Sequence, residues 1–277
     1  MSLTKVLITV KTYPTLSEKY DELVCTAGFR EDGTFIRLFP VPFRKLNYDS
    51  RYSKWQWIEL DLTKNTSDFR PESFRPKDID KEITIGEKID TNHNWAKRKD
   101  IVLGYVYTNL SQLIADAKNP QKNTSLALLK PTEVIDFIWE RCERNWDKNK
   151  MDAVIANQAQ GSLFDIEDTR AVFKVVKKLP YKFSYVFKTE DNMQRTMMIE
   201  DWELGMLYWN CLQNAKGDET IACLKVKERY LDWMSGERNL YFFVGTTKQF
   251  HNIAPNPFII IGTFYPPKLN TNQLSLF

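Results

Sequence analysis

Two runs near the carboxyl end of the chain carry apolar side chains at nearly every position. They span residues 240–244 and 258–261, which is the length of a strand. A strand without a polar face must be covered on both sides, so we expect both runs to be central strands of a layered unit. Both are far too short to cross a membrane as a helix, and no contact with a membrane is expected.

The chain around these runs predicts an α+β layer, which we assign to residues 169–267. Three segments have the composition of short strands, residues 172–176, 183–187 and 197–199. Two stretches with apolar residues at helical spacing follow, residues 202–212 and 221–233. The expected order is therefore strands, two helices and strands.

Residues 1–107 predict a β-rich domain, either a small barrel or a strongly bent sheet. The strongest local signal is the Asp32-Gly33 step between two apolar segments, which favours a tight hairpin. Further strand-like pieces are residues 55–62, 83–86 and 101–106. Several short strands separated by turn residues favour a curled sheet over a helical domain.

Residues 108–168 change character, and we expect a helical segment followed by a linker. Residues 110–115 fit a helix, and Pro131 is well placed in the first turn of a longer helix that extends to residue 148. Residues 148–168 are polar and weakly patterned, which favours a linker. The whole chain is thus predicted to be an α+β protein with a barrel-like amino-terminal unit and a helical middle.

Composition argues against several kinds of site. The net charge is only +3, so any contact with nucleic acid must come from a local patch. Four isolated cysteines and two histidines argue against a structural metal site or a disulfide framework. The chain has no phosphate-binding glycine loop, so no nucleotide cofactor is expected. The amino terminus lacks the apolar segment of a signal peptide, which favours a cytoplasmic protein.

The predicted nucleic-acid surface lies between residues 35 and 77, where basic and aromatic residues are interleaved. Guanidinium groups bind phosphates in a bidentate manner, and exposed aromatic faces stack on unpaired bases. The candidate cations are Arg37, Arg44, Lys45, Arg51, Lys54, Arg70, Arg75 and Lys77. The aromatic residues among them are Phe39, Phe43, Tyr48, Tyr52, Trp55 and Trp57. The alternative is that the aromatic residues belong to the core and that Arg70 pairs with Asp68 or Glu72.

A metal-dependent nuclease would need carboxylates gathered around a divalent metal, often with a lysine. Glu59, Asp61 and Lys64 have a spacing loosely like such a cluster, although Glu59 and Asp61 also fit the solvent face of a strand. Asp201 is better explained as a helix cap, and His251 as a satisfied surface residue. A metal cofactor is implied only under this alternative, and whether the chain is an enzyme stays open.

The last five residues follow a polar segment that contains two prolines, and we assign residues 268–277 to a tail. They are Gln273, Leu274, Ser275, Leu276 and Phe277. This peptide resembles the Gln-Leu-Ser/Asp-Leu-Phe motif by which bacterial DNA polymerases, repair enzymes and mobile-element proteins bind the sliding clamp. The resemblance covers these five residues and implies the bacterial sliding clamp as a partner. The alternative is that the apolar tail docks on its own chain.

Residues 160–164, Gln-Gly-Ser-Leu-Phe, share four residue types with the tail but lack its first leucine. They are either a second clamp contact or a turn that leads into a strand. A second basic run, made of Lys174, Lys177, Lys178 and Lys182, better fits a solvated strand face.

The sequence therefore predicts a clamp-associated DNA-binding accessory protein that acts in replication, repair, mobile-element or defence processes. Two alternatives stay open. One is a clamp-recruited metal-dependent nuclease, or another enzyme of nucleic acids. The other is a factor or inhibitor that binds another protein.

Overall fold

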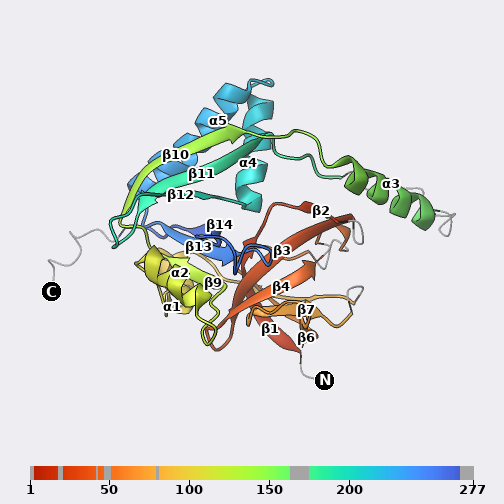
Figure 1. Ribbon diagram of the computed structural model, residues 1–277, viewed down its shortest axis with the longest axis horizontal. Helices are drawn as coiled ribbons and strands as arrows, with labels where there is room; N and C mark the ends of the chain where they lie inside the picture. Colours follow the sequence, from red (N-terminus) through yellow and green to blue (C-terminus); the bar gives the residue numbers. More distant parts are fainter. Residues whose placement is uncertain are drawn as a thin grey trace.

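The amino-terminal unit is one mixed sheet that curls into half a barrel (Figure 1). The computed structural model describes residues 3–17, 21–41, 43–46, 51–78, 81–162 and 175–268. The strands of this sheet are β1 (Thr4–Lys11), β2 (Thr15–Ser17), β3 (Asp21–Arg30), β4 (Phe35–Val41), β5 (Gln56–Leu60), β6 (Leu62–Lys64), β7 (Ser73–Pro76) and β8 (Thr84–Lys88). They pair in the order β6-β7-β4-β3-β1-β5-β8, with β2 against β3, and a short helical turn, η1 (Phe43–Lys45), follows β4.

The hairpin predicted at Asp32-Gly33 is confirmed and joins β3 to β4. Gly33 adopts a positive φ of 78°, which few other residues tolerate, and its amide donates to the Arg30 carbonyl at 3.0 Å. A second glycine, Gly28, allows β1 and β3 to pack closely. A β-carbon at Gly28 would lie 1.8 Å from the carbonyl oxygen of Leu7, so only glycine fits at this crossing.

The rest of the chain builds two three-stranded antiparallel sheets and the helices around them (Figure 1). The helices are α1 (Asn92–Val102), α2 (Leu110–Lys118), α3 (Lys148–Ser162), α4 (Trp202–Asn214), α5 (Glu219–Lys227) and the π-helix η3 (Glu228–Glu237). The strands are β9 (Leu126–Leu129), β10 (Glu133–Arg141), β11 (Tyr181–Lys188), β12 (Arg195–Met198), β13 (Tyr241–Thr246) and β14 (Phe258–Phe264). The sheet orders are β10-β11-β12 and β14-β13-β9, and the predicted α+β class is confirmed. No helix in the described ranges is long and apolar enough to cross a membrane.

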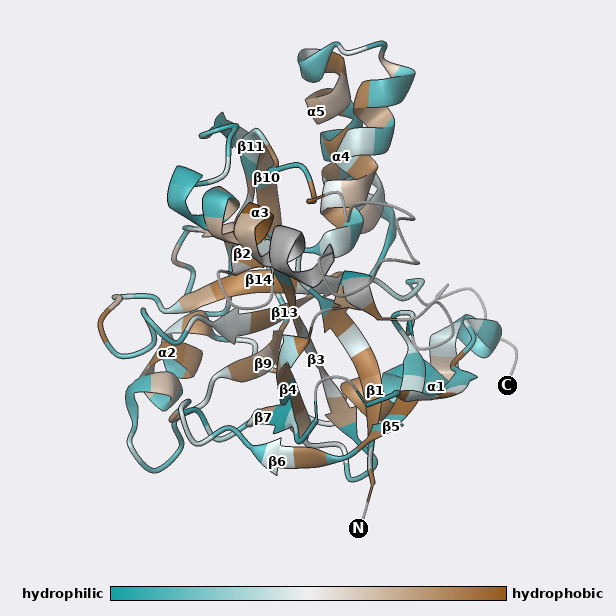
Figure 2. Cartoon of the chain, turned by 90° about the vertical axis from the view of Figure 1, so that its right-hand side faces the viewer, coloured by the Kyte–Doolittle hydropathy of each residue, from teal (hydrophilic) through white to brown (hydrophobic). Residues whose placement is uncertain are grey.

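The two apolar runs form β13 and β14, and two cores meet across them. The predicted central position is confirmed for β13 but is wrong for β14, which lies at the edge of its sheet and is covered by packing on its faces. Phe242 and Val244 of β13 belong to the carboxyl-terminal core. The intervening Phe243 points to the other core, where it packs with Trp55 of the amino-terminal half and with Phe264 of β14. Figure 2 shows these apolar strands in the middle of the molecule, with more polar segments at its edges.

A buried polar cluster, which we call the arginine joint, connects the amino-terminal sheet to β9 and β13. Arg37 of β4 donates to Oγ and to the carbonyl oxygen of Ser125, at 2.8 and 3.0 Å. Arg70 donates to the carbonyl oxygen of Thr246, which also accepts from Arg37. Asp68 holds the Arg70 guanidinium by two parallel hydrogen bonds of 2.9 and 2.6 Å, so that the buried charge is balanced. All five residues are buried.

The helix predicted over residues 131–148 is wrong, because this segment holds the strand β10. β10 pairs with β11 along its whole length, from Glu133 opposite Lys188 to Arg141 opposite Tyr181. Its central residues are mostly β-branched or aromatic, which favours a strand. A long pairing partner far away in the sequence outweighs the local signal that a proline gives for a helix start.

Three further local predictions differ from the structure. Residues 148–162 of the predicted linker form α3. Asp147 caps the start of this helix, because its side chain accepts a hydrogen bond from the Lys150 amide at 3.1 Å. Ile101 and Val102 end α1, so the strand predicted over residues 101–106 is absent. Residues 172–174 lie outside the described residues, and Val175 and Val176 after them are not in a strand.

The arginine joint predicts that two arginines of the same sequence region contribute very differently to stability. We expect Arg37→Met to lower the free energy of unfolding by about 2–4 kcal/mol, because the buried Ser125 and Thr246 carbonyls lose a charged donor. The matched control Arg75→Met, at an exposed position of β7, should change it by less than about 0.5 kcal/mol. Urea unfolding of both variants measures the difference, and equal losses would contradict the joint.

Candidate nucleic-acid interface

The basic residues predicted to bind nucleic acid between residues 35 and 77 do not form one surface. Arg37 and Arg70 lie inside the arginine joint, where they bind carbonyl oxygens instead of facing solvent. Arg44 pairs with the buried Glu22 at 2.6 Å. Arg51 is exposed and donates to two backbone carbonyls of its own loop.

The remaining predicted residues are spread over different environments. Arg75 and Lys77 are exposed, and Lys77 pairs with Asp61 at 2.9 Å. Lys45 lies in η1, whereas Tyr48 falls outside the described residues. Among the interleaved aromatic residues, Tyr52 and Trp55 belong to the core, as the alternative interpretation expected. Lys54 and Trp55, however, also line a cavity.

This cavity, which we call the tryptophan pocket, has a volume of about 420 Å³, within the range of small-ligand sites. It lies where the amino-terminal sheet, α1, the start of α4 and the end of β14 meet. Its lining residues are Lys11, Ser53, Lys54, Trp55, Lys88, Trp95, Arg98, Trp202, Glu203, Thr263 and Tyr265. Four cations and four aromatic rings thus surround one cavity.

A guanidinium group stacks on two tryptophans at one wall of the pocket. The Arg98 guanidinium carbon lies 4.6 Å from the ring centroid of Trp55 and 5.0 Å from that of Trp95. Nε and Nη2 of Arg98 both donate to the carbonyl oxygen of Ile89, at 3.1 and 2.6 Å, which fixes the plane of the group. Among the described residues, Nη1 of Arg98 has no hydrogen-bond partner. The wall therefore keeps donor capacity for a ligand.

The two tryptophans of this wall stand on strained backbone. Trp55 has a φ of 66°, and Trp95 ends a run of three left-handed residues, with φ values of 50° at His93, 55° at Asn94 and 64° at Trp95. Bulky residues rarely adopt this conformation, which costs roughly 1–3 kcal/mol each and is concentrated at functional sites. The Trp55 amide donates a hydrogen bond to the Ile8 carbonyl at 2.6 Å, which holds Trp55 in this conformation.

Lys11 occupies a second, partly desolvated position in the pocket. Its Nζ lies 4.3 Å from the ring centroid of Phe43, 5.8 Å from that of Tyr52 and 5.5 Å from that of Trp202. Burial, assisted by the nearby Lys54 charge, lowers the pKa of Lys11 from 10.5 to about 8. Lys11 is thus charged near neutral pH at some energetic cost, which an anionic ligand would offset.

The third cation, Lys54, is neutralised by the start of α4. Its Nζ lies 3.0 Å from Glu203 and 3.5 Å from Asp201, whose Oδ1 also caps α4 by accepting from the Glu203 amide. Burial alone would lower the pKa of Lys54, but the two carboxylates outweigh it and keep the pKa above its ordinary value. The cap predicted for Asp201 is confirmed, and Lys54 fastens α4 to the amino-terminal sheet.

The pocket combines flat aromatic faces with positive charge, which suits a planar anionic ligand such as a nucleotide. Among the described lining residues, the four cations stand against one carboxylate, that of Glu203, and the exposed Lys88 makes no ion pair with any described residue. Sequence reasoning found only Lys54 and Trp55. The interleaved residues Trp95, Lys97, Arg98 and Lys99 carried the same basic and aromatic signal and were missed.

The candidate metal ligands do not come together. Asp61 pairs with Lys77, while Lys64 donates to the backbone carbonyls of Arg70 and Pro71. Glu59 is half-buried on β5. Within the described ranges, no group of three or more potential metal ligands is placed to hold an ion. The nuclease hypothesis gains no support from these residues.

His251 is satisfied, as expected, but it is buried instead of lying at the surface. Its Nδ1 lies 2.8 Å from Oγ1 of Thr246, and its Nε2 lies 2.7 Å from Oδ1 of Asn123 and 3.1 Å from the Ala117 carbonyl. Burial lowers the pKa of His251. The ring links the β13 end to α2 and the following loop, which is a structural role.

Both clamp-like peptides fall largely outside the described residues. The tail peptide, residues 273–277, lies entirely beyond Lys268, where the described chain ends. Of the second peptide, residues 160–162 end α3, and Leu163 and Phe164 are not described. The assignment of both peptides to a sliding clamp stays a prediction.

Two family models match the chain. Residues 2–104 match a domain of unknown function (DUF8758), and residues 106–277 match a second domain of unknown function (DUF8757). A search of curated proteins gives no match. One solved structure, described as "Structure of murine DNA binding protein bound with ds DNA", aligns over 98% of both chains with 8% identity and a TM-score of 0.30. A likeness at that level supports no inference.

The lowered pKa of Lys11 predicts a pH dependence of stability. The folded chain releases this proton near pH 8, whereas an unfolded lysine keeps it until about 10.5. Between these values the unfolded chain binds more protons, so the Lys11 contribution to stability rises with pH. We expect the free energy of unfolding of the wild type, relative to Lys11→Met, to be higher at about pH 9.5 than at about pH 7. A pH-independent difference would contradict the desolvated position of Lys11.

Proposed function

We propose that this chain, which belongs to the DUF8757 family of unknown function, binds DNA and holds an unpaired base in the tryptophan pocket. The observation that carries the proposal is the wall of Trp55, Arg98 and Trp95, on which a base can stack. Stacking on aromatic side chains is how many proteins bind single strands without strong sequence preference.

The charges of the pocket support a strand whose phosphates lie near the stacked base. Lys11 and Lys88 are not neutralised by a carboxylate in a direct ion pair within the described chain, and Arg98 keeps a free donor nitrogen. A phosphate beside Lys11 would recover the energy lost when that ammonium group is desolvated. The low net charge of +3 agrees with binding through one local site instead of a broad basic face.

The tail supports DNA as the nucleic acid, because its sequence is similar to peptides that bind the bacterial sliding clamp. The described chain ends at Lys268, which donates to the Gly236 carbonyl, only three residues after Tyr265 of the pocket. A clamp bound to residues 273–277 would therefore keep the pocket close to DNA that passes through the ring. In this proposal the clamp delivers the protein, and the pocket binds unpaired nucleotides near it.

Binding of a labelled oligothymidine of about 12 nucleotides tests the pocket. We expect Trp95→Ala to weaken binding by about 1–3 kcal/mol, which is roughly 5- to 150-fold, because one stacking face is lost. Lys88→Ala should weaken binding and reduce the slope of log affinity against log salt by about 0.7, as expected when one phosphate contact to a single strand is removed.

Lys182→Ala serves as the matched control, since Lys182 is exposed on β11 and does not line the pocket. Its affinity and salt slope should equal those of the wild type. Equal affinity for the oligothymidine and for duplex DNA would contradict the proposal, as would full binding by Trp95→Ala.

Titration of a purified bacterial sliding clamp tests the tail separately. We expect micromolar binding by the full chain that is lost in a version ending at Asn272 and in Phe277→Ala, because buried apolar anchors supply most of the affinity of such peptides. Lys182→Ala, which leaves both clamp-like peptides intact, is the control and should bind as the wild type does. Equal binding by the full and shortened chains would remove the clamp from the proposed function.

A further inference from the structure

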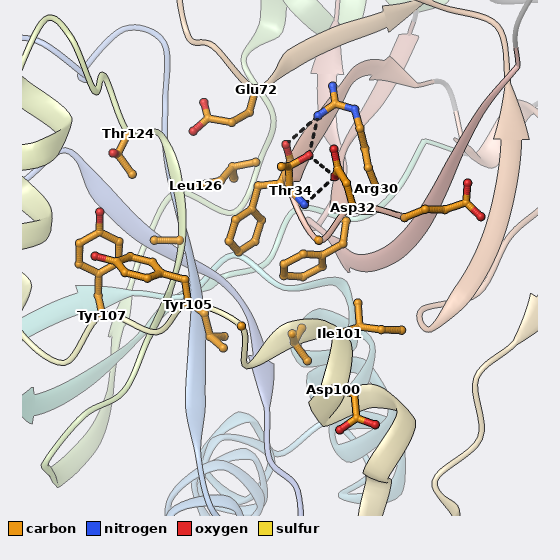
Figure 3. A pocket seen from close by; sticks show the side chains of 18 of the residues that line it. Arg30, Asp32, Thr34, Glu72, Asp100, Ile101, Tyr105, Tyr107, Thr124 and Leu126 are labelled. Carbon is orange, nitrogen blue, oxygen red and sulfur yellow. Dashed lines mark hydrogen bonds between the residues drawn. The ribbon is translucent and has the colours of Figure 1, made fainter.

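A second hollow, which we call the tyrosine groove, lies on the other side of α1 and has a volume of about 720 Å³ (Figure 3). The β3–β4 turn forms one wall, and the end of α1 with the segment up to Tyr107 forms the other. Leu126 and Leu128 of β9 and Phe29 of β3 contribute apolar surface between them. No residue of this groove belongs to the tryptophan pocket.

The groove is acidic, although the whole chain is basic. Among the described residues that line it are four carboxylates, those of Glu31, Asp32, Glu72 and Asp100, and one cation, Arg30. Glu31 pairs with Lys5 outside the groove, and Glu72 accepts from the amide and hydroxyl of Ser125. Asp100 is exposed and has no partner among the described residues. This charge repels nucleic acid and favours a cationic ligand.

Two tyrosines line the groove, of which Tyr105 is exposed and Tyr107 is buried. Tyr105 is 66% exposed, which is unusual for so large a side chain, and it is held against Tyr107 in an edge-to-face contact with ring centroids 4.9 Å apart. Figure 3 shows both rings facing the same hollow as Leu126, with Asp100 below and Asp32 opposite. An exposed aromatic ring that packs on a buried neighbour is typical of surfaces that anchor a partner chain.

We propose that the tyrosine groove binds a short cationic segment of a partner protein. An arginine or lysine of that segment packs on Tyr105 and pairs with Asp100, while an apolar neighbour enters between Phe29 and β9. The charge complementarity selects this occupant. The chain's own tail is a poor match, because residues 269–277 contain no lysine or arginine. The same carboxylates disfavour the phosphates of DNA.

Selection from a random-peptide display library on the immobilised full-length protein tests the groove. We expect the enriched peptides to share a net positive charge and at least one large apolar residue. Their dissociation constants should rise about tenfold or more for Tyr105→Ala and for Asp100→Lys, as expected when an interface anchor is removed.

Two control variants keep the test specific. Glu143→Lys reverses a charge at an exposed position outside the groove, and Ile253→Ala removes an apolar side chain that is 72% exposed elsewhere. Both should bind the selected peptides as the wild type does. Any of three outcomes would overturn the proposal: enrichment of neutral or acidic peptides, unchanged peptide binding by Tyr105→Ala, or no enrichment at all. Oligothymidine binding by Tyr105→Ala should equal that of the wild type, which separates this site from the proposed DNA site.

Discussion

The architecture depends on two buried arginines that hold the two halves of the molecule together. Arg37 and Arg70 converge on the carbonyl oxygen of Thr246, and Arg37 also binds Ser125. A buried cation is tolerated only where acceptors or a counter-charge surround it. Asp68 supplies the counter-charge for Arg70, and oxygen atoms of Ser125 and Thr246 accept from Arg37. This requirement fixes how β9 and β13 meet the amino-terminal sheet. The tryptophan pocket forms at a second place where residues of the same two halves meet.

Helix α1 lies between the two candidate sites and gives them opposite character. Trp95 and Arg98 of α1 line the basic tryptophan pocket, whereas Asp100 and Ile101, two and three residues after Arg98, line the acidic tyrosine groove. The left-handed backbone of His93, Asn94 and Trp95 sets the direction in which the Trp95 ring points. Opposite charges on neighbouring faces would let a nucleic acid and a cationic protein segment bind one chain without competing for the same surface.

Parts of the fold were predictable because their signals are local or depend only on burial. The Asp32-Gly33 hairpin follows from backbone preference, and the burial of β13 and β14 follows from their uniform apolarity. β10 was mistaken for a helix because Pro131 is a local signal, whereas its partner β11 lies some forty residues away. For the site, Lys54 and Trp55 were found, but Lys11, Trp95 and Arg98 were not, since nothing in the sequence brings these segments together.

The sequence alone determined the α+β class, the hairpin, the cap at Asp201 and a terminal peptide similar to clamp-binding motifs. Each of these depends on neighbouring residues or on apolar content. Only the tertiary structure decided which cations are available to a ligand. Arg37 and Lys11 are both basic residues of strands. Arg37 donates to buried carbonyl oxygens, whereas Lys11 faces a cavity. Charge is a property of the residue, whereas accessibility and partners are set by chain segments far away in the sequence.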